Sequence, residues 1–230
     1  MSTSGKIKIA KDGPYVVTGS VPITMATIDT NDAGDAISWG GEAEQAVSET
    51  FALCRCGESQ TKPFCDGSHA RVKFDGTETA SREPLLKQAQ LLDGPTMQLV
   101  DARVLCAYGR FCDVNGSVWD QVGESDKPET RANLIRQVGN CPSGRLVVID
   151  KVTRKAIEPE LPVSIAIVED PSTGCSGPLW ARGGIELVGA DGVTYEVRNR
   201  MTLCRCGRSD NKPFCNGAHA SAPPFQDGLG

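Results

Sequence analysis

The sequence lacks the features that would assign it to several common functional classes. Its 230 residues contain only two histidines, and no apolar run approaches the length of a membrane span. The net charge of -5 is spread without long runs of one sign, which argues against a surface for nucleic acid or anionic membranes. No GxGxxG or GxxxxGK loop for a nucleotide occurs.

A catalytic constellation is missing as well. Both His69 and His219 stand in cysteine-rich loops, so no Ser-His-Asp or Cys-His pair remains for an enzyme active site, and we expect none. The N-terminal stretch has no apolar segment typical of a secretory signal. We therefore expect a cytoplasmic protein, in which the ten cysteines bind metal or do redox work rather than form disulfides.

The sequence does contain one unusual loop, and it contains it twice. CRCGESQTKPFCDGSHA begins at Cys54, and CRCGRSDNKPFCNGAHA begins at Cys204. Each loop reads CxC, then eight residues, a cysteine, three residues and a histidine. The candidate metal ligands are Cys54, Cys56, Cys65 and His69 in the first copy, and Cys204, Cys206, Cys215 and His219 in the second.

The spacing predicts how four ligands converge from two short pieces of backbone. Cys54 and Cys56 share a face of an extended chain, and a helical turn capped by Asp66 would place Cys65 and His69 one turn apart. Glycines that suit a close approach of the backbone to a bulky group flank the ligands: Gly57, Gly67, Gly207 and Gly217. The matching register of both loops argues against unrelated buried thiols and ordinary histidines. A tetrahedral zinc site is the alternative, although CxC spacing favours one iron of a dinuclear cluster.

Both loops resemble the CDGSH iron-sulfur domain, the mitoNEET family. The family pattern is matched by Cys54, Cys56, Ser59, Pro63, Cys65, Asp66, Gly67, Ser68 and His69, and by Cys204, Cys206, Ser209, Pro213, Cys215, Gly217, Ala218 and His219. The second copy has Asn216 where the family usually has aspartate. The resemblance implies one [2Fe-2S] cluster per loop, thus two clusters, each with three cysteines and one exposed histidine as ligands. Family members usually pair two clusters across a homodimer, so this chain resembles a fused form, a monomer with an internal pseudo-dimer.

The ligand set predicts the function. Replacing a thiolate by a neutral imidazole should raise the cluster potential, and the histidine makes the site sensitive to acid. We expect electron transfer or cluster transfer, with a redox partner or an apo-acceptor protein. A zinc-stabilised interaction module and a redox sensor remain alternatives. Four recurring basic residues either offset cluster charge or form solvated surface: Arg55, Lys62, Arg205 and Lys212.

The fold class predicted is α+β, mainly β, with two β-rich CDGSH-type repeats in a pseudo-two-fold cradle and a small α+β middle domain. The expected bounds are 1–82, 83–170 and 171–230. Segments beginning at Gly13 and Gly177 each predict two short strands joined at a glycine, and the polar stretch 25–50 predicts a surface excursion. In the middle we expect helices over 83–92 and 130–139, and strands over 145–150 and 162–170.

Four further cysteines occur outside the loops, at Cys106, Cys112, Cys141 and Cys175. CAYGRFC and the later NCPSG resemble a divergent mono-cluster ferredoxin domain of the kind that accompanies CDGSH loops, although the compact CxxCxxC run is missing. We expect buried structural thiols, with a third cluster on these four residues as the alternative. The tryptophans, Trp39, Trp119 and Trp180, are expected in core or hairpin packing.

Overall fold

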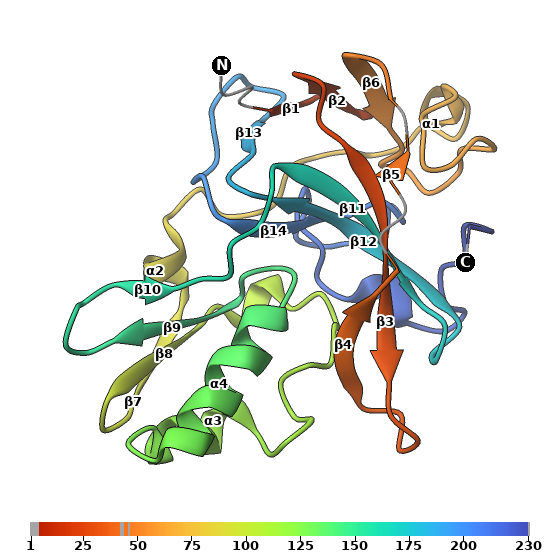
Figure 1. The fold of residues 1–230 in the computed structure, drawn as a ribbon. Helices are drawn as coiled ribbons and strands as arrows, with labels where there is room; N and C mark the ends of the chain where they lie inside the picture. The colour runs from red at the N-terminus through yellow and green to blue at the C-terminus, as the bar shows by residue number, and fades with distance from the viewer. Residues whose placement is uncertain (1–4, 42–43, 46, 230) are drawn as a thin grey trace.

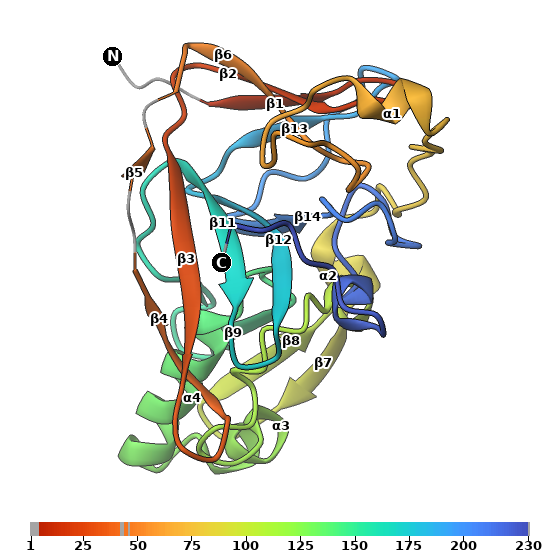
Figure 2. The same ribbon diagram turned by 90° about the vertical axis from the view of Figure 1, so that its right-hand side faces the viewer.

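The computed structural model describes residues 5–41, 44–45 and 47–229, and its strands form three sheets (Figures 1 and 2). The first has the order β13-β1-β2-β6, the second β14-β12-β11-β3-β4 with β5 beside β3, and the third β10-β9-β8-β7. The strands are β1 Lys6–Ile9, β2 Tyr15–Thr18, β3 Ile23–Thr30, β4 Ala36–Gly40, β5 Glu44–Gln45, β6 Thr50–Leu53, β7 Gln90–Asp93, β8 Met97–Asp101, β9 Leu146–Asp150, β10 Ala156–Ile157, β11 Ser164–Asp170, β12 Cys175–Arg182, β13 Glu186–Val188 and β14 Arg200–Leu203. The α-helices are α1 Ser68–Arg71, α2 Leu85–Gln88, α3 Val118–Gln121 and α4 Pro128–Asn140. The chain is thus α+β and mainly β, as predicted.

The first two sheets share one pattern of pairing, and each takes in strands from the other repeat: β13 enters the first sheet, and β3 enters the second together with β4 and β5. In the first sheet β2 pairs with β6 and aligns Tyr15 with Leu53, and in the second β12 pairs with β14 and aligns Leu179 with Leu203. β13 lies parallel to β1, while β3 lies parallel to β11. The exchange of β3 and β13 between the sheets produces the pseudo-two-fold cradle.

The strand exchange changes the meaning of the two predicted hairpins. The strands after Gly13 and Gly177 are present, but the chain leaves its own sheet at Gly19 in the first repeat and at Gly183 in the second. Both glycines have positive φ, at 96° and 74°, which other residues adopt at a cost. Each segment therefore forms two strands joined at a glycine, as predicted, but the two strands do not pair with one another, because β3 pairs with β11 and β13 pairs with β1.

The surface excursion predicted for 25–50 is correct for the exposed turn 31–35 and for most of 41–50, of which residues 42, 43 and 46 lie outside the described part, but it is wrong for the sheet-forming residues around it. β3 and β4 form an antiparallel hairpin that widens the second sheet. Ala26, Ile28 and Ala36 are buried there with Trp39 and Trp180 packed nearby, the ring centroids of the two tryptophans 4.7 Å apart. Alternation of small apolar and polar residues along this stretch is a strand signal that its polar composition obscured.

The main core lies between the two repeat sheets. β1 alternates exposed lysines with buried isoleucines, so that Ile7 and Ile9 face inward. They pack with Ile165, Leu179 and Leu203 of the second sheet in one cluster. Burying each such side chain contributes about 1.5–3 kcal/mol, so this shared core ties the two repeats into one body.

The middle segment has its own sheet and its own core, at the lower left of Figure 1. Helix α4 confirms the helix predicted over 130–139, and buries Leu134 and Val138 against Met97 and Leu146. The helix predicted over 83–92 is restricted to α2, because the residues after it form β7 and pair with β8. Tertiary pairing thus overrides local helical spacing.

The tryptophans lie where the sequence predicts them, in core packing. Trp119 packs against the middle core and donates its indole N–H to Asp101 at 2.9 Å, so all three tryptophans serve packing as expected.

Strand β11, grouped with the middle segment by sequence, pairs with β12 and β3. Over residues 5–41, 44–45 and 47–229, no helix combines the length and apolar character needed to cross a membrane.

Candidate metal centres

The first pair of candidate ligands in each loop stands at the end of a strand. β6 ends at Leu53, and the chain continues extended into Cys54 and Cys56, whose Sγ atoms are 3.8 Å apart. In the second copy β14 leads in the same way to Cys204 and Cys206, again with 3.8 Å between the Sγ atoms. The predicted shared face of the CxC motif is confirmed, so each loop offers two thiols to one position.

The second pair in each loop stands on a tight turn. The Cys65 Sγ and His69 Nδ1 atoms are 3.3 Å apart, and Cys215 and His219 repeat this distance. Asp66 accepts a hydrogen bond from the Ser68 N–H at 2.9 Å, but the N-cap of α1 is Gly67, so the capping position predicted for Asp66 is wrong by one residue. Helix α1 in the first loop and the 3-10 turn Ala218–Ala220 in the second therefore bring the predicted cysteine and histidine of each loop together.

Backbone hydrogen bonds hold both pairs in the same relative position. The Cys54 N–H donates to the Pro63 carbonyl at 2.8 Å, and the Cys65 N–H donates to the Ala52 carbonyl at 2.9 Å. The same two bonds recur in the second loop, from Cys204 to Pro213 and from Cys215 to Thr202, each at 2.9 Å. The two ligand pairs are thus fixed by main chain, which leaves their side chains free to bind.

The recurring arginines support the loops from behind. Arg55 and Arg205 are almost fully buried, at 1% and 3% exposure. They donate to the carbonyls of Gly13 and Gly177, equivalent positions of the two repeats. Because each arginine lies between two cysteines of an extended CxC, it points away from the sulfurs. The alternative of solvated surface charge is therefore wrong for the two arginines. The two lysines are half-buried, and each donates a hydrogen bond to a backbone carbonyl, Lys62 to Ser59 and Lys212 to Ser209.

The two loops lie back to back. Cys56 and Cys206 form an isolated antiparallel bridge. A Cβ on Gly57 would lie 2.6 Å from the Cys206 carbonyl oxygen, and one on Gly207 would lie 2.5 Å from that of Cys56. Only glycine permits this approach. The sequence predicted a close backbone approach at these two glycines, and the structure shows it, but the group approached is the backbone of the other loop rather than a bulky group.

The two sites differ in exposure. Cys65 and His69 are half-buried, whereas Cys215 and His219 are 3% and 4% exposed. Phe225 covers the second site: it clusters with its cysteines, and its N–H donates to the His219 carbonyl at 2.8 Å. The exposed histidine implied by the resemblance is thus absent from the second copy, because the C-terminal segment folds over it.

Burial and neighbouring charge alter the acid-base behaviour of the second site. The pKa of Cys204 is lowered to about 6, because its thiolate accepts a hydrogen bond from Cys206, whose own pKa is raised. The pKa of His219 is lowered to about 4, first by burial and then by the Arg205 charge. At neutral pH this pair supplies a thiolate and the histidine is uncharged, which are the forms that bind metal.

Sequence reasoning missed two residues that shape the second site. Tyr15, from the first repeat, donates its hydroxyl to the carbonyls of Cys204 and Pro213, at 2.9 and 3.0 Å. Its equivalent in the second repeat is Leu179, which has no hydroxyl to donate. That difference was a usable sequence signal. The role of Phe225 depends on the fold alone.

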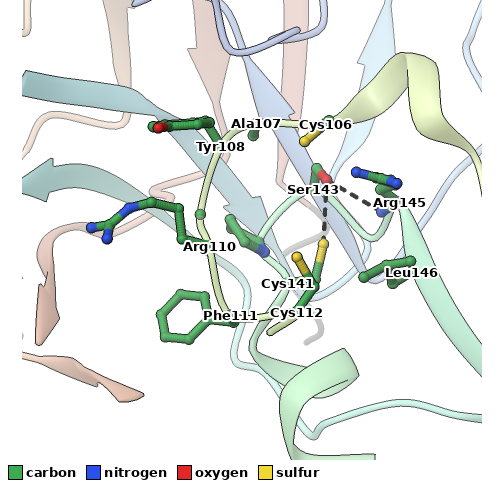
Figure 3. Close-up of a pocket in the computed structure, with 12 residues that line it drawn as sticks. Cys106, Ala107, Tyr108, Arg110, Phe111, Cys112, Cys141, Ser143, Arg145 and Leu146 are labelled. Atoms are coloured by element: carbon green, nitrogen blue, oxygen red, sulfur yellow. Dashed lines mark hydrogen bonds between the residues drawn. The ribbon is translucent and has the colours of Figure 1, made fainter. Parts of the chain in front are cut away.

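Three of the four remaining cysteines line one pocket. Cys106, Cys112 and Cys141 turn toward it from two loops (Figure 3), and each is half-buried. Arg145 also lines this pocket and forms an ion pair with Asp101. They are half-buried rather than buried, and Cys112 and Cys141 also pack against the middle core, so a structural role for these thiols stays a prediction.

Cys175 lies apart from the pocket. It is buried at the start of β12, where its Sγ lies 3.1 Å from the Thr173 hydroxyl, and it lines a different cavity with Asp170 and Ser176. The four-cysteine set considered from sequence is corrected to three. Cys175 fits the expectation of a buried structural thiol.

Comparison with known families finds two matching family models. The family model described as an iron-binding zinc finger of CDGSH type matches residues 12–70 and 176–220. A second family model, described as a divergent 4Fe-4S mono-cluster, matches residues 92–151. No curated protein and no solved structure matches the chain. The first match contains all eight candidate ligands, and the second contains the three pocket cysteines.

Proposed function

Since this chain is a CDGSH-family iron-sulfur protein with two CDGSH-type segments, we propose that each of its loops holds one [2Fe-2S] cluster. Three cysteines and one histidine would bind each cluster: Cys54, Cys56, Cys65 and His69 in the first site, and Cys204, Cys206, Cys215 and His219 in the second. When bound, a cluster of this kind accepts and returns one electron.

The observation that carries the proposal is the pairing of the donors. Each loop presents two sulfurs 3.8 Å apart and, separately, a sulfur and a nitrogen 3.3 Å apart. Two pairs suit two irons, whereas structural zinc requires four donors around a single ion. The arrangement therefore favours a dinuclear cluster over the zinc-stabilised interaction module.

The residues around the donors favour the reduced, more negative state. The N–H groups of Glu58 and Gly67 point at the sulfurs of Cys56 and Cys65, both at 3.5 Å, and Gly217 does the same for Cys215 at 3.4 Å. Such long N–H···S contacts stabilise negative charge on sulfur. A neutral imidazole in place of a fourth thiolate acts in the same direction, so the potential should lie above that of an all-cysteine cluster.

The middle segment supports a third cluster site. Cys106, Cys112 and Cys141 lie inside the match to the divergent 4Fe-4S family and share one pocket. The Arg145 guanidinium lines the same pocket, whereas burial and Asp113 raise the pKa of Cys112 to about 12, so this thiol must lose its proton when it binds a cluster. We propose that these three cysteines bind a cluster of the type that this family name describes, without Cys175.

With these groups bound, we propose that the protein carries electrons to and from a protein partner and has no substrate of its own. Transfer of an intact cluster is open only to the first site, whose Cys65 and His69 are partly exposed. A redox sensor is the remaining alternative, since it uses the same chemistry. We further propose that the chain acts as a monomer in the cytoplasm, with the second repeat in the place of a dimer partner.

The test is metal and sulfide analysis after anaerobic purification. The two CDGSH-type sites together should contribute about four irons and about four acid-labile sulfides. Cys65→Ala should remove about two irons, and Cys112→Ala should remove only those of the middle site. Zinc in place of iron in the parent would overturn the proposal.

A further inference from the structure

We propose that the three cluster sites form a linear electron relay in which the second CDGSH-type site is the central member, between the first site and the middle segment. The inference rests on the proposed function, because it requires all three clusters. It adds an order of transfer, which neither family assigns. The middle segment also contacts the first repeat, where the Trp39 indole N–H donates to the Asn140 carbonyl, but of the two ligand turns it packs on that of the second site, and this breaks the pseudo-two-fold.

The link between the first and second sites is the back-to-back contact of their loops. Cys56 and Cys206 each bind their own cluster and face one another across a bridge. The Cys56 carbonyl oxygen would lie 2.5 Å from a Cβ built on Gly207, and the Cys206 carbonyl oxygen would lie 2.6 Å from a Cβ built on Gly57. A short path through ligand backbone therefore joins the two sites.

The link between the second site and the middle segment involves Gly217, which lies between Cys215 and His219. A Cβ on Gly217 would be 3.3 Å from the Cys106 carbonyl oxygen and 3.5 Å from the Tyr108 Cβ. The loop that begins at Cys106, a ligand of the middle site, thus packs on the ligand turn of the second site. Another contact lies beside it, where the Asn211 side-chain amide donates to the Val104 carbonyl at 3.2 Å.

The equivalent turn of the first site has no such neighbour. Gly67 has the same φ of 86° as Gly217, but a Cβ built there would meet nothing within 4 Å. The first ligand turn faces open space at the point where the second is covered by the middle segment. The contact between CDGSH-type loop and middle segment therefore belongs to the second repeat.

Burial assigns the central and terminal positions. All four ligands of the second site are less than 9% exposed, so a partner protein has no direct approach to them. Cys65 and His69 of the first site are partly exposed, as are the three cysteines of the middle pocket. A buried cluster between two accessible ones passes electrons between its neighbours, whereas the accessible ones exchange electrons with partners.

The electron count closes with one external donor and one external acceptor, both one-electron carrier proteins, the acceptor taking the electron from the middle cluster. A reduced one-electron carrier protein gives one electron to the first cluster and is itself oxidised by one. The first cluster then reduces the second, and the second reduces the middle cluster, so each step oxidises one cluster and reduces the next. No bond forms or breaks, and no proton is required.

The order is testable by electron paramagnetic resonance (EPR), because a paramagnetic neighbour speeds the relaxation of a cluster signal in a distance-dependent way. Site variants Cys65→Ala and Cys215→Ala assign the two CDGSH-type signals. With the middle cluster paramagnetic, the second signal should relax severalfold faster than the first. Cys112→Ala, which removes the middle cluster, should abolish that enhancement and leave the first signal unchanged, whereas Cys175→Ala should keep it.

Iron analysis of the same samples separates the possible failures. No iron in the middle segment would overturn the third cluster and the relay with it. Full loading with equal relaxation of both CDGSH-type signals, or enhancement confined to the first, would overturn the relay alone. Should a variant not fold, the parent suffices: poising the middle cluster in its paramagnetic and diamagnetic states must change the relaxation of one signal and spare the other.

Discussion

Cys56 and Cys206, equivalent residues of the two repeats, face each other across an antiparallel bridge. In most proteins two such metal-binding loops would keep their distance, because thiolates and clusters repel. Here the contact is made by backbone, through the glycine after each cysteine, while the sulfurs point into their own sites. The two clusters are thereby neighbours without sharing ligands.

This contact predicts that Gly207→Ala is strongly destabilising. The Cβ would lie 2.5 Å from the Cys56 carbonyl oxygen, and the φ of 76° costs a further ~1–2 kcal/mol. We expect a loss of unfolding free energy of about 3 kcal/mol or more in denaturant titrations. Gly34→Ala is the control, because it has a φ of 83° and open space around the Cβ. Equal losses in the two variants would show that the loop contact carries no energy.

Exposure predicts the order in which acid removes the clusters. Protonation of a ligand histidine competes with iron, and His69 is partly exposed whereas His219 is 4% exposed. Visible absorbance should therefore decay in two phases below about pH 6.5. His69→Cys should slow the fast phase severalfold, and His219→Cys should affect the slow phase. A single decay phase whose rate is unchanged by both substitutions would contradict this order.

The iron-free protein should lose stability in acid because of His219. Burial, with the Arg205 charge, lowers its pKa to about 4, so the unfolded chain, with a histidine pKa near 6.5, binds the proton first as pH falls. The contribution of His219 to the unfolding free energy should be constant above about pH 7 and decrease between about pH 6.5 and pH 4, by at most about 3 kcal/mol. His219→Gln should remove that slope, as measured by urea titration at several pH values. A slope unchanged by His219→Gln would assign it to other groups.

The Asp66 and Asn216 pair predicts unequal potentials. Backbone N–H groups of Gln60 and Ser68 hold the pKa of Asp66 well below its usual range, so it stays charged beside the first site. Asn216 makes the matching bond to the Ala218 N–H at 3.2 Å without a charge. Asp66→Asn should raise the first potential by on the order of tens of millivolts, and Asn216→Asp should lower the second. Redox titration followed by EPR measures both, and one unresolved wave unmoved by either change would contradict the prediction.

The placement of Cys175 predicts which thiols the middle cluster needs. Cys175→Ala should leave iron and sulfide content unchanged, since this residue lines a different cavity from the three pocket cysteines. Cys106→Ala, Cys112→Ala and Cys141→Ala should each remove the middle cluster while the CDGSH-type signals persist. Iron lost from Cys175→Ala, with the fold intact by circular dichroism, would restore the four-cysteine set.

Local sequence was a good guide wherever local geometry decides the structure. The CxC spacing places Cys54 and Cys56 on one face because a strand alternates, and the CxxxH spacing brings Cys65 to His69 because a turn has nearly four residues. Helix α4 was predictable for the same reason. At α2 the same reasoning failed, because the residues that continue its helical pattern gain more from pairing as β7 with β8.

The sequence by itself determined both ligand sets, the repeat and the mainly β character, since spacing and alternation act within a few residues. Only the tertiary structure decided the exchange of β3 and β13, the exclusion of Cys175 and the burial of His219 beneath Phe225. Strand signals specify an extended chain but leave its hydrogen-bonding partner open. That partner, like the cover over a site, depends on contacts between segments that are distant in sequence and meet only when the cores pack.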